Sequence, residues 1–134
     1  MVLPSGRLSA TELVRILNLL PVDLSFVDAN DQVKYFSEPA ERIFPRARSV
    51  IGRKVQNCHP PKSVHIVEKI VDGFRTGKKD SADFWINLHG KMVLIRYLAV
   101  RDETGRYLGT LEVSQDITPL RALEGEKRLL DWKD

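Results

Sequence analysis

Four side chains in this sequence belong to types that bind metal ions: Cys58, His59, His65 and His89. Cys58 and His59 are adjacent, whereas a loop that wraps a zinc ion separates its first two ligands by two or more residues. His59 and His65 flank the start of a predicted helix, and His89 falls in a predicted turn farther along the chain. We interpret all four as helix-end or surface residues and predict no metal site.

Motifs that indicate an enzyme are absent from the sequence. It has no glycine-rich phosphate loop, no serine nucleophile elbow and no pair of histidines on one helix face. Its many carboxylates are explained as ordinary surface acids. We therefore predict no catalytic residues and expect a protein that binds rather than catalyses.

The composition indicates one globular domain. The 134 residues are 29% charged and 43% hydrophobic, and no run approaches the roughly 18 apolar residues of a membrane span. The net charge is +3, but lysine and arginine are scattered among 18 acidic residues, which argues against nucleic-acid binding. A single cysteine and a start without an apolar leader predict a cytoplasmic protein.

The first third of the chain predicts a helix followed by a β-hairpin. Ser9 and Glu12 have the spacing of a capping box, so a helix should span 9–20. The apolar stripe of this helix recurs at helical spacing: Leu13, Ile16, Leu17 and Leu20. Alternating runs at 23–27 and 32–36 then predict two strands joined by a tight turn.

Two more helices are predicted in the middle of the chain. A serine and a proline in its first turn favour a short helix over 37–44. A longer helix should begin at Pro60 and end at Gly77. A helical wheel places Phe74 on its buried face and His65 on its solvent face.

The last third predicts three strands at 81–88, 92–101 and 106–116, joined by hairpin-length turns. Thr118 and Pro119 then favour the start of a helix that runs to the C-terminus. Its leucines follow the spacing of a coiled-coil seam: Leu120, Leu123 and Leu130.

This order of elements, together with four segments, resembles the PAS domain. The segments are Leu20-Pro21 with Phe26-Val27-Asp28, Val50-Ile51-Gly52, Thr76-Gly77, and the closing run from Leu111 to Asp116-Ile117-Thr118. The resemblance implies an α+β fold: a five-stranded antiparallel sheet with short helices on one face, plus N-terminal and C-terminal flanking helices. It divides the chain into a flexible N-terminus (1–8), a flanking helix (9–20), the PAS core (21–118) and an exit helix (119–134).

Three further segments are similar to the C-terminal PAS module of a bacterial and archaeal family that is often joined to a hemerythrin-like helical domain. They lie at 57–63, 84–86 and 95–97. This likeness implies a cytoplasmic sensing role and a hemerythrin-like or other signalling domain as partner. It also implies that the chain could be one part of a larger protein.

In the PAS fold a ligand pocket lies between the long helix and the inner face of the sheet. The resemblance thus implies these candidate walls: Phe26, Tyr35, Ile66, Ile70, Phe74, Phe84, Ile86 and Leu111. Some PAS sensors ligate heme through a histidine on the long helix, for which His59 and His65 are the candidates here. Cys58 lacks the surrounding sequence of the light-sensing flavin cysteines.

We therefore predict a sensory or regulatory module that binds a small ligand or partner and forms a homodimer. Two alternatives stay open: a dimerisation scaffold without ligand, and a heme-binding redox or gas sensor. The predicted dimer contact comprises the two flanking helices, through Leu13, Ile16, Leu17, Leu20, Leu120, Leu123 and Leu130.

Overall fold

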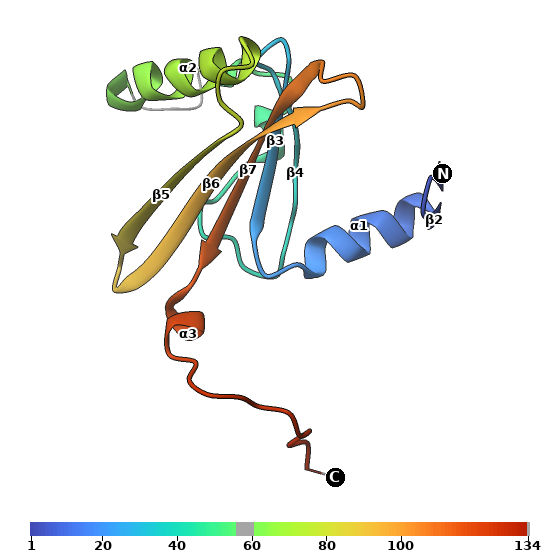
Figure 1. Ribbon diagram of the computed structural model, residues 1–134, viewed down its shortest axis with the longest axis vertical. Helices are drawn as coiled ribbons and strands as arrows, with labels where there is room; N and C mark the ends of the chain where they lie inside the picture. Colours follow the sequence, from blue (N-terminus) through green and yellow to red (C-terminus); the bar gives the residue numbers. More distant parts are fainter. Residues whose placement is uncertain (56–60, 134) are drawn as a thin grey trace.

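The computed structural model describes residues 1–55 and 61–133. The elements run in the order β1 (Val2–Leu3), β2 (Gly6–Arg7), α1 (Ala10–Leu19), β3 (Asp23–Asp28), β4 (Val33–Phe36), the 3₁₀ turn η1 (Arg48–Val50), α2 (Pro61–Arg75), β5 (Ser81–Leu88), β6 (Lys91–Arg101), β7 (Tyr107–Asp116) and α3 (Thr118–Arg121) (Figure 1). The predicted hairpin, the long helix and the three-stranded meander are confirmed within one or two residues at their ends.

Five strands form one antiparallel sheet in the order β4-β3-β7-β6-β5. The last strand of the meander, β7, therefore lies at the centre, between β3 of the early hairpin and β6. This closure brings β3 and β7 very close at Gly109, where a Cβ would lie 2.2 Å from the carbonyl oxygen of Val27 and 2.7 Å from the ring of Phe26. Only glycine fits there, so the central pairing depends on this residue.

Helix α2 packs its apolar side on one face of the sheet, which we call the inner face. Val67, Val71 and Phe74 are buried, and Phe74 is only 1% exposed. His65 lies on the exposed side of the helix, as the helical wheel predicts. The helix ends after Arg75, where Gly77 adopts the left-handed conformation (φ +78°) that commonly terminates helices.

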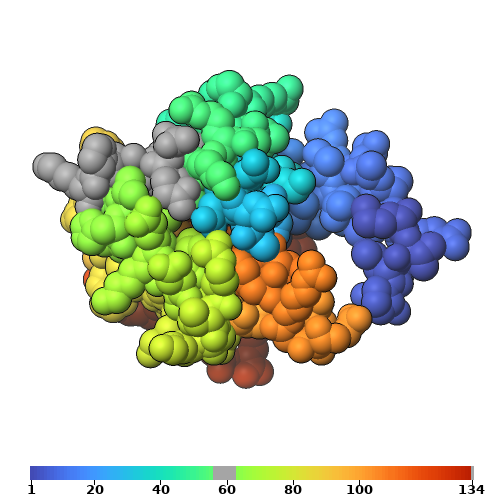
Figure 2. Space-filling view, turned by 90° about the horizontal axis from the view of Figure 1, so that it is seen from above, coloured from blue at the N-terminus to red at the C-terminus, as the bar shows by residue number. Residues whose placement is uncertain are grey.

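Helix α1 begins with the predicted capping box. The Ser9 hydroxyl accepts a hydrogen bond from the Glu12 amide (3.1 Å), and the Glu12 carboxylate accepts one from the Ser9 amide (2.9 Å). The helix buries no side chain and projects from the side of the sheet (Figure 1, Figure 2). A hydrogen bond from the Glu38 amide to Asn18 Oδ1 (2.8 Å) joins its C-terminal end to the segment after β4.

Residues 1–8, which we predict to be flexible, contain a small hairpin. Strands β1 and β2 pair antiparallel, and the Leu8 amide donates to the Met1 carbonyl (3.0 Å). Gly6 allows the tight return of the chain. This pairing was not predicted, because two-residue strands leave no detectable alternation in the sequence.

The predicted exit helix over 119–134 is realised only as α3, which ends at Arg121. Gly125 adopts a left-handed conformation (φ +61°), and residues 122–133 contain no helix. Leu123 and Leu130 are 73% and 71% exposed. A short helix without a surface to pack against is marginal in water, which explains the correction.

The predicted helix over 37–44 is also absent. Instead of capping a helix, the Ser37 hydroxyl accepts a hydrogen bond from the Leu24 amide on the neighbouring strand (3.0 Å). The Arg42 guanidinium donates to the carbonyls of Ser37 (2.7 Å) and Phe44 (2.9 Å), so these carbonyls need no helical partner. In this segment, hydrogen bonds that involve side chains take the place of the backbone hydrogen bonds of a helix.

Among the helices in the described part of the chain, none is long and apolar enough to cross a membrane.

Candidate ligand-binding site

Between α2 and the inner face of β5 and β6 the structure contains a cleft of about 510 Å³. This volume falls within the range of small-molecule sites. The helix contributes Ile66 and Ile70, which lie one turn apart on the same side. The sheet contributes Phe84 and Ile86, which alternation along β5 places on the inner face. An apolar helix face and an apolar strand face thus oppose each other across the cleft.

Several of these apolar walls are not covered by the rest of the described chain. Ile66, Phe84 and Ile86 keep 45%, 39% and 38% of their surface exposed, although all three border the inner side of the fold. The Phe84 ring meets the Tyr97 ring edge to face, with centroids 6.0 Å apart. Exposed aromatic and branched side chains gathered in one concavity are typical of a binding surface.

Four polar side chains border the same cleft: Arg46, Ser63, Tyr97 and Glu112. Tyr97 and Glu112 are directly opposite each other on β6 and β7. Arg46 Nη2 lies 3.9 Å from Glu112 Oε1. Burial, and secondarily the Glu112 charge, raises the pKa of Tyr97, so its hydroxyl stays protonated at neutral pH. The cleft therefore offers hydrogen-bond donors and an acceptor beside apolar walls.

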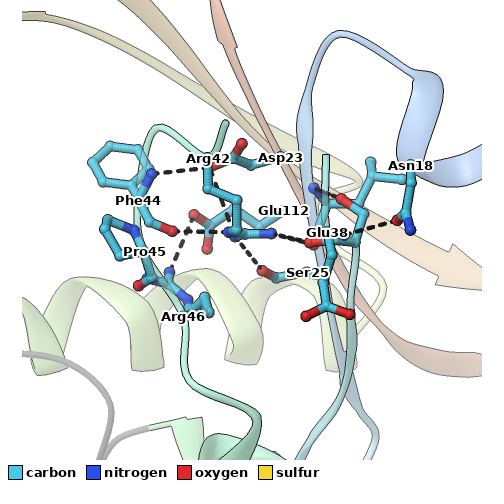
Figure 3. A network of polar contacts seen from close by, with 11 residues as sticks. Asn18, Asp23, Ser25, Glu38, Arg42, Phe44, Pro45, Arg46 and Glu112 are labelled. Atoms are coloured by element: carbon cyan, nitrogen blue, oxygen red, sulfur yellow. Dashed lines mark hydrogen bonds and ion pairs between the residues drawn. The ribbon is translucent and has the colours of Figure 1, made fainter. Parts of the chain in front are cut away.

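A polar network positions the segment that carries Arg46. Arg42 donates hydrogen bonds to three backbone carbonyls, those of Leu24, Ser37 and Phe44. Its guanidinium also lies 3.7 Å from Asp23 Oδ2, and the two side chains are only 10% and 4% exposed. Asp23 also accepts a hydrogen bond from the Phe44 amide (2.9 Å). Figure 3 shows Arg42 and Glu112 near the centre of this network, with Phe44 and Arg46 on one side and Glu38 and Asn18 on the other. The network holds Phe44 and Arg46 against the sheet and connects the cleft region to α1.

A second pocket, of about 350 Å³, lies between this segment and the β5–β6 turn. It is bordered by Pro21, which follows α1, and by Asp116, which precedes α3. Its most buried charges, Asp23 and Arg42, already pair with each other. The cleft against α2 is therefore the better candidate for a ligand site.

The structure brings half of the predicted pocket walls together. Ile66, Ile70, Phe84 and Ile86 line the cleft. Phe74 belongs to the core beneath α2 and reaches only a neighbouring surface groove.

Phe26, Tyr35 and Leu111 are not part of the cleft, which corrects their assignment as pocket walls. Phe26 pairs with both Leu111 and Tyr35, so the three share one face of the sheet. Their chain neighbours Val27 and Thr110 face α2. Because successive side chains along a strand alternate, the three point to the opposite, outer face.

Of the two heme candidates, the structure describes only His65, which does not line the cleft. It is exposed and borders a neighbouring groove together with Lys69. His59 and Cys58 lie outside the described residues. Among the residues that the structure does describe, no three His, Cys, Asp or Glu side chains cluster as metal ligands.

Sequence reasoning did not identify Arg46 and Glu112. Glu112 carried a detectable signal, because it occupies an inward position between the outward residues Leu111 and Val113 on an alternating strand. A charged residue at an inward position indicates a functional or paired role. Arg46 carried no such signal, since it lies in an irregular segment.

Comparison with known proteins places this fold in a family. Residues 13–118 match the family model described as PAS domain. The crystal structure of a C-terminal domain from Streptococcus mutans is 37% identical, with a TM-score of 0.87, and the match covers 92% of this chain and 96% of that one. The chain therefore belongs to the PAS domain family.

More distant structures share the fold at lower identity. A sensory box sensor histidine kinase from Vibrio cholerae is 14% identical (TM-score 0.56; 79% of this chain and 89% of that one covered). The PAS domain of Bordetella pertussis BvgS is 15% identical (TM-score 0.57; 81% and 89% covered). A comparison with curated proteins finds no significant match.

Proposed function

We propose that this PAS domain is a sensory or regulatory module that binds a small molecule in the cleft between α2 and strands β5 and β6. The observation that carries the proposal is the exposure of Ile66, Phe84 and Ile86 within one concavity. In a domain whose core is filled by its own side chains, such positions are buried. A bound ligand would cover these side chains, and removing their apolar surface from water would favour binding.

The family supports a signalling role. Structures with this fold include parts of sensor histidine kinases, as the Vibrio cholerae example shows for that protein. Among the described residues that line the cleft, no hydrogen bond joins the Ser63 hydroxyl to the Glu112 carboxylate as a nucleophile to its base, which favours binding over catalysis. We further propose that the module reports to a hemerythrin-like or other signalling domain in the cytoplasm.

The ligand proposal is tested by native mass spectrometry of the protein as purified. We expect a complex heavier than the chain by the mass of a small molecule, which disappears when the protein is denatured. Detection of the ligand-free chain alone, from cells grown under several conditions, would favour the scaffold alternative.

We also propose that the module forms a homodimer through its flanking segments. Ile16 and Leu20 of the α1 stripe are 47% and 41% exposed, and no residue of the helix is buried. The outer face of the sheet adds a second apolar surface, since Trp85 on β5 is 66% exposed. A two-fold pairing buries such surfaces against their own copies.

A further inference from the structure

The ion pair beside the cleft is too long for a direct hydrogen bond. Arg46 Nη2 and Glu112 Oε1 are 3.9 Å apart, and their side chains keep 27% and 17% of their surface exposed. Within the described residues, the Arg46 side chain makes one hydrogen bond, to the Pro45 carbonyl (3.2 Å), and Glu112 accepts none. N–H donors of the Arg46 guanidinium and lone pairs of the Glu112 carboxylate are therefore available to a ligand in the cleft that both residues line.

The signs of these two groups restrict the charge of a ligand's polar end. A cationic end attracted by Glu112 would approach Arg46 within a few ångströms, and an anionic end attracted by Arg46 would approach Glu112 equally closely. A neutral end avoids both repulsions. If it carries an acceptor next to a donor, it satisfies Arg46 and Glu112 at once.

The walls of the cleft indicate the shape of the rest of the ligand. Ile66 and Ile70 form one side of the cleft, and the edge-to-face pair Phe84 and Tyr97 lies on the sheet side. An apolar slot between a helix and a sheet, lined partly by rings, favours a flat aromatic body over a branched one.

Building on the proposed function, we propose that the cleft binds a neutral, planar heteroaromatic molecule with a lactam edge, in which a carbonyl lies next to a ring N–H. Arg46 donates to the carbonyl oxygen, Glu112 accepts from the N–H, and the apolar walls cover the ring.

Four bicyclic probes of similar size test this assignment: 2-quinolone, N-methyl-2-quinolone, 2-naphthoate and 2-naphthylmethylamine. Binding is measured by titration, with ¹H–¹⁵N correlation spectra to locate the affected amides. We expect 2-quinolone to bind about tenfold or more tightly than its N-methyl form, because methylation removes the donor to a charged acceptor. Both charged probes should bind more weakly than 2-quinolone.

Two variants separate the roles of the ion-pair members. In Glu112→Leu the preference for 2-quinolone over its N-methyl form should disappear, because the acceptor is gone. In Arg46→Met both quinolones should weaken by a similar factor, and the preference should persist. Arg121→Met, which removes a positive charge remote from the cleft, is the control and should match the wild type. Circular dichroism confirms that each variant is folded.

The outcomes distinguish this inference from the proposed function beneath it. Equal binding of all four probes at the cleft, or preference for a charged probe, would overturn the lactam assignment and leave the ligand site intact. Absence of binding by every probe would also overturn it. The proposed function is contradicted as well only if native mass spectrometry of the purified protein detects no bound ligand. The wild-type comparison of the two quinolones decides the question even if a variant does not fold.

Discussion

At the scale of single residues, two buried serines differ in whether their hydroxyl has a partner. Ser37 is 0% exposed and its Oγ accepts a hydrogen bond from the Leu24 amide (3.0 Å). Ser114 is 1% exposed, and its Oγ has no partner among the described residues. A buried hydroxyl stabilises the fold only when it is bonded.

Replacing each serine with alanine tests this difference. Ser37→Ala leaves the Leu24 amide without an acceptor and should lower the free energy of unfolding by about 1–3 kcal/mol. Ser114→Ala removes a buried hydroxyl that makes no hydrogen bond among the described residues, so the free energy of unfolding should stay unchanged or rise slightly. Denaturant unfolding of both variants provides the measurement. Equal destabilisation by the two substitutions would show that both hydroxyls are satisfied.

The residue scale is also where prediction from sequence was weakest. Phe26 and Leu111 were assigned to the pocket but lie on the outer face of the sheet. A shift of one residue along a strand exchanges its two faces, and a strand that is apolar on both sides gives no signal to choose between them. The apolar stripe of α2 covers only one side, so Val67, Val71 and Phe74 were placed correctly.

At the scale of elements, α1 depends on a charged cap. Hydrogen bonds from the Ser9 backbone and side chain hold the pKa of Glu12 below its ordinary value of 4.5. A carboxylate with a lowered folded-state pKa stabilises the structure fully above the unfolded pKa, and this contribution is lost as the pH falls through the folded pKa. Helix α1 should therefore fray on acidification.

The ¹³Cα chemical shifts of Ala10–Leu19, followed from about pH 6 to about pH 2, report this fraying. We expect the helical shifts at the N-terminal turn to decrease below the ordinary pKa of glutamate. Glu12→Gln, which retains a side-chain acceptor but does not titrate, should show no such change. An identical decrease in the glutamine variant would mean that another group destabilises the helix.

Elements were predictable where local signals and packing agree. Capping, helical spacing and glycine turns specified α1, α2 and the meander before any tertiary contact was considered. The predicted helix over 37–44 was overridden by tertiary hydrogen bonds to β3, which no local pattern reveals: the Ser37 hydroxyl accepts from the Leu24 amide, and the Phe44 amide donates to Asp23. The exit helix failed for the opposite reason, because Leu123 and Leu130 have no surface in one copy of the chain to pack against.

At the scale of the whole molecule, the homodimer proposal predicts twice the mass of one 15.3 kDa chain by light scattering at micromolar concentration. Replacing Leu13 and Leu17 with glutamate should yield a monomer, since charges on the stripe oppose its self-association. Val14→Glu is the matched control, because Val14 is 49% exposed on the same helix but lies outside the stripe. A single-chain mass that the stripe variants do not change would contradict the dimer.

The central claim is that the cleft between α2 and the inner face of β5 and β6 holds a small molecule. Its most direct test compares two isoleucines that are both 45% exposed, Ile66 in the cleft and Ile51 outside it. A tryptophan at Ile66 fills the cleft, whereas a tryptophan at Ile51 adds the same bulk elsewhere. By native mass spectrometry we predict that the wild type and Ile51→Trp carry the same bound mass and that Ile66→Trp carries none. The claim would be contradicted if both variants keep the bound mass, or if both lose it.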